Sequence, residues 1–275
     1  KIAILDMVVS DWQAMRNTLV EVKQCLETTD LSKRIATNAV TTTLARIDPQ
    51  ETQAFLDWVL SDNFIFLGYR EYRYEQEPTG IEIYSLGDTG LGLLRGESEE
   101  KLSDSFHQLP PALRSLANRP QVLILSKSRN LSPVHRPVYM DFLGIQKFVD
   151  KGQVIGEYRF IGLLTAAAYE LNVSQIPLLR QKVTSVLTMA RLPANGHAYN
   201  KFQHILNTLP RDDLFQASTD ELYPMVMGIA NLHDKNQLKL FTRIDHFERF
   251  VSCLVYIPRD KFNTELRLAI QAGLV

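Results

Sequence analysis

The sequence has few cysteines, no long apolar run and little net charge, and each shortage excludes a class of protein. Its 275 residues include two cysteines, Cys25 and Cys253, both in apolar surroundings. We therefore expect buried free thiols in a reducing, cytoplasmic compartment, with neither a disulfide framework nor a metal site. The longest apolar run without a charge, residues 160–169, is about half the length of a membrane span, and no signal peptide is visible.

The charge balance argues against two kinds of partner. The chain has 30 basic and 31 acidic residues, a net charge of −1 and a pI near 6.7. No block of like charges is present, so we expect neither nucleic acid nor an anionic membrane as a partner. A hydrophobic content of 45% excludes a disordered chain, and the length suits about two domains.

Catalytic and metal-binding patterns are also missing. None of the six histidines has the spacing of a metal site, and there is no serine elbow or pair of catalytic carboxylates. The histidines are His107, His135, His197, His204, His233 and His246.

The first part of the chain is helical in pattern. One apolar stripe predicts a helix over residues 10–26, which packs on a core or, alternatively, on another subunit; it consists of Trp12, Met15, Leu19, Val22 and Leu26. A second helix is expected over 31–46. A third begins at Asp48, with Pro49 at its first position and Glu51 closing a capping box.

Strand patterns dominate the next hundred residues. Apolar or alternating segments predict six strands, at 64–74, 81–86, 90–95, 121–126, 139–149 and 154–165. The last two form a hairpin around the loop 150–152, whose glycine suits a tight turn. Residues 97–108 are expected to be helical, and a short helix ends at 117. These elements predict an antiparallel sheet with helices on one side, an α+β fold.

A helical period returns from residue 174 to 232, with a capping box at Ser218 and Glu221. Two strands follow, at 237–242 and 250–257, and then a helix at 264–272. Such a pair of strands needs more strands to cover its apolar face, so we expect a segment of a longer polypeptide; the start at Lys1 agrees with this.

Four long stretches resemble the large NAD-specific glutamate dehydrogenases of bacteria, in the regulatory half that precedes the dehydrogenase. The clearest is RIDHFERFVSCLVYIPRDKFNTELR at 243–267. The others are DNFIFLGYREYRY at 62–74, the segment 132–169, and IPLLRQKV at 176–183 with LPRDDLFQ at 209–216. Together they lie within residues 48–267.

The resemblance implies ACT-like or PAS-like antiparallel sheet modules joined by helical segments. On this basis we assign 1–47 to a helical segment, 48–172 to an ACT- or PAS-like α+β domain, 173–233 to a helical connector and 234–275 to the start of a further ACT-like module. The implied parent reaction is oxidation of L-glutamate to 2-oxoglutarate and ammonium with NAD. Implied partners are the catalytic half of the same polypeptide, further copies in a homo-oligomer, and an amino-acid effector.

Hydride chemistry should leave a mark that this segment lacks. The only glycine-rich candidate, Gly90-Leu91-Gly92-Leu93-Leu94-Arg95-Gly96, is one residue longer than a dinucleotide fingerprint and leads into acidic residues. We therefore predict no catalytic and no cofactor-binding residue here, with NAD confined to the parent enzyme.

One segment is a candidate regulatory-ligand site. Two prolines fix the approach to a long strand and place His135 and Arg136 at its rim, and Arg159 enters from the paired strand. An arginine fork suits a carboxylate, as an amino-acid effector would require. The alternative, which we favour, is a structural ion pair among Arg136, Asp141, Glu157 and Arg159. Three hypotheses follow: a regulatory and assembly segment, a scaffold without ligand, and an independent small-molecule sensor.

Overall fold

The computed structural model describes residues 1–28, 48–77, 80–96, 100–103, 120–149, 153–194, 196–232, 237–245 and 250–274. The chain divides into two compact units, Lys1–Lys182 and Val183–Val275. The described residues mix helices with antiparallel strands, which confirms the predicted α+β class.

The first unit contains a six-stranded antiparallel sheet with strand order β3-β2-β1-β6-β5-β4. Its strands are β1 (Phe64–Glu77), β2 (Gly80–Gly92), β3 (Lys101–Leu102), β4 (Leu123–Leu131), β5 (Tyr139–Phe148) and β6 (Val154–Leu164). Every pairing is antiparallel, with β1 and β6 at the centre. The β5–β6 hairpin predicted from the sequence is confirmed; its loop, 150–152, lies outside the described residues.

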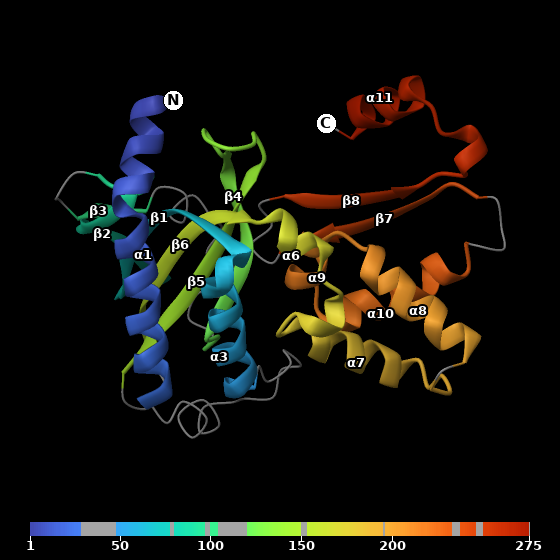
Figure 1. The fold of residues 1–275 in the computed structure, drawn as a ribbon, viewed down its shortest axis with the longest axis horizontal. Helices are drawn as coiled ribbons and strands as arrows, with labels where there is room; N and C mark the ends of the chain where they lie inside the picture. The colour runs from blue at the N-terminus through green and yellow to red at the C-terminus, as the bar shows by residue number, and fades with distance from the viewer. Residues whose placement is uncertain are drawn as a thin grey trace. The chain divides into compact units, whose positions relative to one another are not determined.

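Two helices from the N-terminal part of the chain pack on the sheet. The long helix α1 (Ile2–Thr28) packs against β1, β2 and α3 (Pro49–Trp58), and Figure 1 shows both helices in front of the sheet. Met15, Leu19 and Val22 of α1 are buried, as the apolar stripe predicts. Beneath the helices, Phe160 contacts Tyr69 with ring centroids 4.8 Å apart. In the first unit, α1 therefore packs on the sheet that is formed by the strands after it in the sequence.

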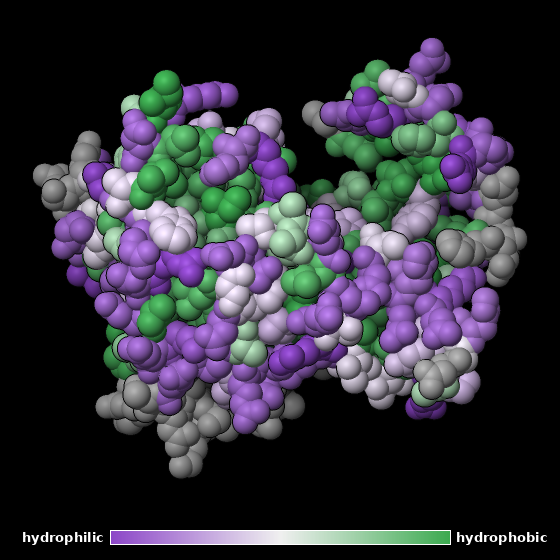
Figure 2. Space-filling model, in the orientation of Figure 1, coloured by the Kyte–Doolittle hydropathy of each residue, from purple (hydrophilic) through white to green (hydrophobic). Residues whose placement is uncertain are grey.

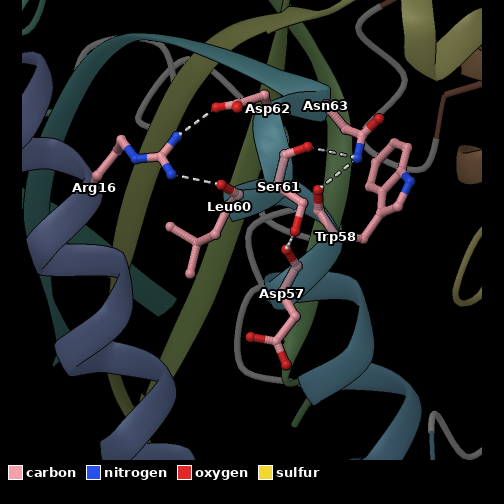
Figure 3. A network of polar contacts seen from close by, with 7 residues as sticks. All are labelled: Arg16, Asp57, Trp58, Leu60, Ser61, Asp62 and Asn63. Atoms are coloured by element: carbon pink, nitrogen blue, oxygen red, sulfur yellow. Dashed lines mark hydrogen bonds and ion pairs between the residues drawn. The ribbon is translucent and has the colours of Figure 1, made fainter.

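A tight turn joins α3 to β1. The chain makes one π-helical turn, η1 (Val59–Asn63), and leaves it with Asp62 at a positive φ of 60°. The Arg16 guanidinium of α1 donates to the Leu60 carbonyl at 2.6 Å and to the Asp62 carboxylate at 3.0 Å (Figure 3). Asn63 donates its side-chain amide to the Trp58 and Ser61 carbonyls. These contacts satisfy carbonyls that the end of a helix leaves without partners.

The first unit ends in short helices that return to α3. They are α6 (Ala166–Glu170), the 3₁₀ turn η4 (Val173–Gln175) and the start of α7 (Leu179–Met189). Glu51 of α3 accepts a hydrogen bond from the Leu178 backbone N–H at 2.9 Å and from the Arg180 guanidinium at 2.8 Å. The predicted capping box at Glu51 is therefore wrong, because the carboxylate turns to this long-range pair, while Asp48 caps the amide of Gln50 as expected.

The second unit combines helices with a two-stranded antiparallel sheet. It holds the rest of α7, followed by α8 (His197–Thr208), α9 (Arg211–Gln216), α10 (Thr219–Ala230), β7 (Lys239–Ile244), β8 (Val251–Tyr256), the 3₁₀ turn η5 (Arg259–Lys261) and α11 (Thr264–Gly273). The predicted capping box of α10 is confirmed, since Ser218 and Glu221 exchange both hydrogen bonds.

Several predictions differ from the structure. Residues 90–92 continue β2, so no separate strand exists at 90–95. Of the helix predicted over 97–108, the structure describes only residues 100–103, where Lys101 and Leu102 form β3 by pairing with β2. Cys25 and Cys253 are exposed, so the prediction that both thiols are buried is wrong; along β8, alternation leaves Cys253 exposed on the same face as Val251. Trp12 is 38% exposed and lies outside the buried stripe of α1. The helices expected at 31–46 and up to 117 lie outside the described residues.

No helix among the described residues has both the length and the apolar character that crossing a membrane requires.

Candidate functional site

Two of the four predicted site residues, Arg136 and Asp141, meet at the end of β6. Arg136 donates to the Leu164 carbonyl at 2.7 Å, and the Asp141 carboxylate accepts the Leu164 N–H at 2.8 Å. The second Asp141 oxygen pairs with Lys127 at 2.6 Å across the β4–β5 register. The Arg136 guanidinium also lies 5.6 Å from the ring centre of Tyr169. Both charged groups therefore hold the backbone where β6 gives way to α6.

The third residue, Arg159, lies on another part of the sheet. Its guanidinium pairs with Glu157 two positions earlier on β6 and lies 3.6 Å from the centre of the Tyr72 ring. The same guanidinium lies 5.1 Å from the ring centre of Phe142 on the neighbouring strand β5. The hydroxyl of Tyr74 donates to the remaining Glu157 oxygen at 2.8 Å. We call Tyr72, Tyr74, Glu157 and Arg159 the β1–β6 cluster.

Within the β1–β6 cluster, the charged form of Arg159 and the neutral form of Tyr74 are favoured. Burial opposes the charged form of Arg159, but the neighbouring Glu157 carboxylate outweighs burial and raises the pKa of the guanidinium. Burial, followed by the charge of Glu157, raises the pKa of the Tyr74 phenol well above its ordinary value. The cluster therefore combines the Arg159–Glu157 ion pair with a neutral Tyr74 that donates a hydrogen bond.

The fourth residue, His135, is exposed and has a positive φ of 61° in the segment between β4 and β5. The structure thus brings Arg136 and Asp141 together and keeps Arg159 apart. In place of the single ion-pair network expected among Arg136, Asp141, Glu157 and Arg159, it has two separate pairs, Lys127–Asp141 and Arg159–Glu157. A ligand role for these residues stays a prediction.

The glycine-rich turn does not fit a dinucleotide. The Gly92 N–H, which a pyrophosphate would need as a donor, already donates to the Asp11 carboxylate at 2.8 Å, and Arg95 pairs with the same carboxylate. Gly92 has a φ of +55°, and a Cβ there would lie 2.3 Å from the Leu67 carbonyl oxygen. Glycine is therefore required because the chain crosses β1 closely, and the geometry offers no cradle for phosphate.

No group of three or more His, Cys, Asp or Glu side chains within the described ranges could hold a metal ion.

A buried charge pair that the sequence analysis missed lies in the second unit. The Arg243 guanidinium of β7 donates to the Asp213 carboxylate of α9 at 3.1 Å and to the Gln216 side chain at 3.2 Å. Ser252 of β8 donates to the same Asp213 oxygen at 2.7 Å. Two of the stretches that carry the family resemblance, 209–216 and 243–267, therefore meet here. The only sign of this pair in the sequence is that Asp213 and Arg243, thirty positions apart, carry opposite charges.

Comparisons with known proteins agree with these stretches. A family model described as glutamate dehydrogenase, helical motif 1 matches residues 176–235, and one described as glutamate dehydrogenase, ACT2 domain matches 239–275. The Arg243–Asp213 pair joins the two matched regions. The chain is 36% identical over 230 residues to an NAD-specific glutamate dehydrogenase of Halomonas elongata.

This chain is similar to a part of the NAD-specific glutamate dehydrogenases. Proteins of that name from Pseudomonas aeruginosa and Mycobacterium tuberculosis are 36% and 32% identical to it, over 226 and 230 residues. The alignments cover 82–83% of this chain and 13–14% of the relatives, so the chain corresponds to about one seventh of their length. The family resemblance predicted from the sequence is confirmed.

Proposed function

We propose that this chain is a non-catalytic regulatory and assembly segment of a cytoplasmic NAD-dependent glutamate dehydrogenase. The observation that carries the proposal is the match to helical-motif and ACT2 models of that enzyme, in a chain whose glycine-rich turn does not fit a dinucleotide. The parent reaction would be oxidation of L-glutamate to 2-oxoglutarate and ammonium with NAD. Its chemistry would lie elsewhere in the polypeptide.

A regulatory role requires that an effector favour one of two packings of these modules. Couplings of this kind are typically about 1–3 kcal/mol, so an effector would change the affinity of the catalytic half by roughly 5- to 150-fold. Among the residues predicted for such a site, Arg136 is the best placed, because it is partly exposed and its carbonyl partner leaves other guanidinium N–H groups for a carboxylate.

The second candidate is a scaffold that binds no small molecule. This role is supported by the contacts that the charged residues make within the fold. Asp141 pairs with Lys127 and accepts a hydrogen bond from the Leu164 N–H, and Arg159 pairs with Glu157. Each charge then stabilises the sheet, and the segment would act through contacts between modules and subunits.

Isothermal titration calorimetry of the 275-residue chain with a panel of amino acids separates the two roles. Saturable binding of an amino acid that Arg136→Ala weakens supports regulation at the predicted site. The matched control is Arg129→Ala, an exposed arginine on β4. Silence toward every amino acid, together with a mass that rises with concentration, supports the scaffold. Tight binding of NAD would contradict both.

A further inference from the structure

Leu178, the residue before α7, has a backbone conformation that leucine rarely adopts. Its φ is +67°, in the left-handed region, where the Cβ crowds a neighbouring carbonyl oxygen. It follows Pro177 in a turn, and a turn with proline at its second position and a positive φ at its third usually has glycine or asparagine there. The Leu178 side chain is also buried. Contacts from elsewhere in the fold must therefore hold this backbone in place.

The start of α7 receives its cap from α3. In a capping box, a glutamate at the third position of a helix accepts the backbone N–H of the residue that precedes the helix. The third position of α7 is Gln181, and the first turn of this helix, which is described throughout, contains no acidic residue. Instead, Glu51, 127 positions earlier, accepts the Leu178 N–H at 2.9 Å. A negative charge at this end of a helix is also stabilised by the helix dipole.

The Glu51 carboxylate is held inside the fold with both oxygens in use. Hydrophilic side chains cover much of the face shown in Figure 2, whereas Glu51 is only 8% exposed. Its second oxygen accepts a hydrogen bond from the Arg180 guanidinium at 2.8 Å. We propose that the Glu51 carboxylate is a latch that keeps Leu178 at a positive φ and thereby sets where α7 begins. When the latch is released, Leu178 leaves the left-handed region and the first turn of α7 opens.

The latch lies where the first unit leads into the helical motif. The chain passes from the first unit to the second within α7, between Lys182 and Val183. The match to helical motif 1 begins at residue 176, so the latched turn is the first part of that motif. The proposal deepens the regulatory role given under Proposed function and rests on it. An effector that favours the latched or the released turn would change the start of the helical motif.

Hydrogen exchange of the 275-residue chain, followed by mass spectrometry, measures the latch directly. Glu51→Ala removes the acceptor, so the amides of residues 178–183 should exchange roughly tenfold faster or more, since a hydrogen bond to a charged group is lost. The amides of α8 and of the β5–β6 hairpin are references within the same molecule and should change far less. Glu51→Gln retains a side-chain oxygen for the Leu178 N–H and should restore part of the protection.

Arg180→Ala is the matched control. It removes a side chain that is 45% exposed and leaves the carboxylate to accept the Leu178 N–H, so its effect on residues 178–183 should be only a few-fold. Equal effects of Arg180→Ala and Glu51→Ala would overturn the latch in favour of a simple ion pair. Unchanged exchange at 178–183 in Glu51→Ala, or a uniform rise over the whole chain, would also overturn it.

Glu51→Gln decides the matter if Glu51→Ala does not fold. A smaller rise confined to residues 178–183 is then expected, and no rise or a uniform one would overturn the proposal. These measurements need no effector, so their failure is distinct from a failure of the calorimetric test of the proposed function.

Discussion

The carboxylate of Asp213 accepts hydrogen bonds from both Arg243 and Ser252, so a single buried charge joins helix α9 to strands β7 and β8. The Arg243 side chain is only 4% exposed and that of Asp213 only 10%. Buried pairs of this kind are costly to break, because removing one partner leaves the other charge without compensation. The contact therefore fixes the region matched by the ACT2 model on the region matched by the helical motif.

Asp213→Asn should destabilise the second unit by about 3 kcal/mol, since the uncharged amide leaves the buried Arg243 guanidinium unpaired. Ser252→Ala removes one hydrogen bond from the same carboxylate and should cost only about 1 kcal/mol. Hydrogen exchange of the β7 and β8 amides, with urea unfolding, measures both effects. Equal effects of the two variants would contradict this role for the charge.

Arg159→Met should destabilise the first unit by about 3–5 kcal/mol, because Glu157, with a side chain only 2% exposed, would remain buried without its cation. Replacing both residues by methionine should recover much of the loss, since an apolar pair needs no compensation. Thermal unfolding of the two single variants and the double variant gives the coupling between the residues. Additive losses would show that Arg159 and Glu157 do not act as a pair.

Stability should fall in acid through Glu51. Burial opposes its charged form, but the Arg180 guanidinium and the Leu178 N–H outweigh burial and lower the pKa of the carboxyl below its ordinary value. The ionised form thus stabilises the fold above the ordinary glutamate pKa of about 4.3, and the gain is lost as pH falls through the lowered pKa.

Glu51→Gln should therefore have a lower unfolding free energy than the wild type, and the difference should be largest near neutral pH. It should shrink as the pH falls below about 4.3 toward the lowered pKa of Glu51. Glu27→Gln is the control, because the Glu27 side chain is 49% exposed in its pair with Lys23 and should contribute little at any pH. Urea unfolding at several pH values measures both. A constant difference between wild type and Glu51→Gln would show that the carboxylate charge is unimportant.

Gly92→Ala should be strongly destabilising, because the new methyl would meet the Leu67 carbonyl oxygen at 2.3 Å in a backbone conformation that favours glycine. Gly273→Ala is the matched control: no atom lies within 4 Å of a Cβ there, and the residue ends a helix. Comparison of the two melting temperatures checks this. A harmless Gly92→Ala would reopen the question of why the turn is rich in glycine.

Most strands were predictable because their signal is local. Alternating and apolar runs located β1, β5 and β6 to within a few residues, and the cap at Ser218 located α10. The two residues of β3 lie in a charged segment and form a strand only by pairing with β2, which no local pattern shows.

The partners of the charged residues were less predictable, because they depend on register and on contacts between distant segments. Asp141 pairs with Lys127 because the β4–β5 register sets them opposite each other. Glu51 meets Arg180 from 129 positions away, which displaced the local capping box. Arg159 and Glu157, two positions apart on one strand face, were the exception, since alternation alone brings them together.

The central proposal is that this chain does not itself carry out the hydride transfer that the name of its relatives implies. The most direct measurement is the formation of NADH by the purified chain with L-glutamate and NAD, with the same mixture lacking glutamate as control. The account predicts no glutamate-dependent NADH at any protein concentration. A rate that depends on glutamate and scales with the amount of this chain would contradict it.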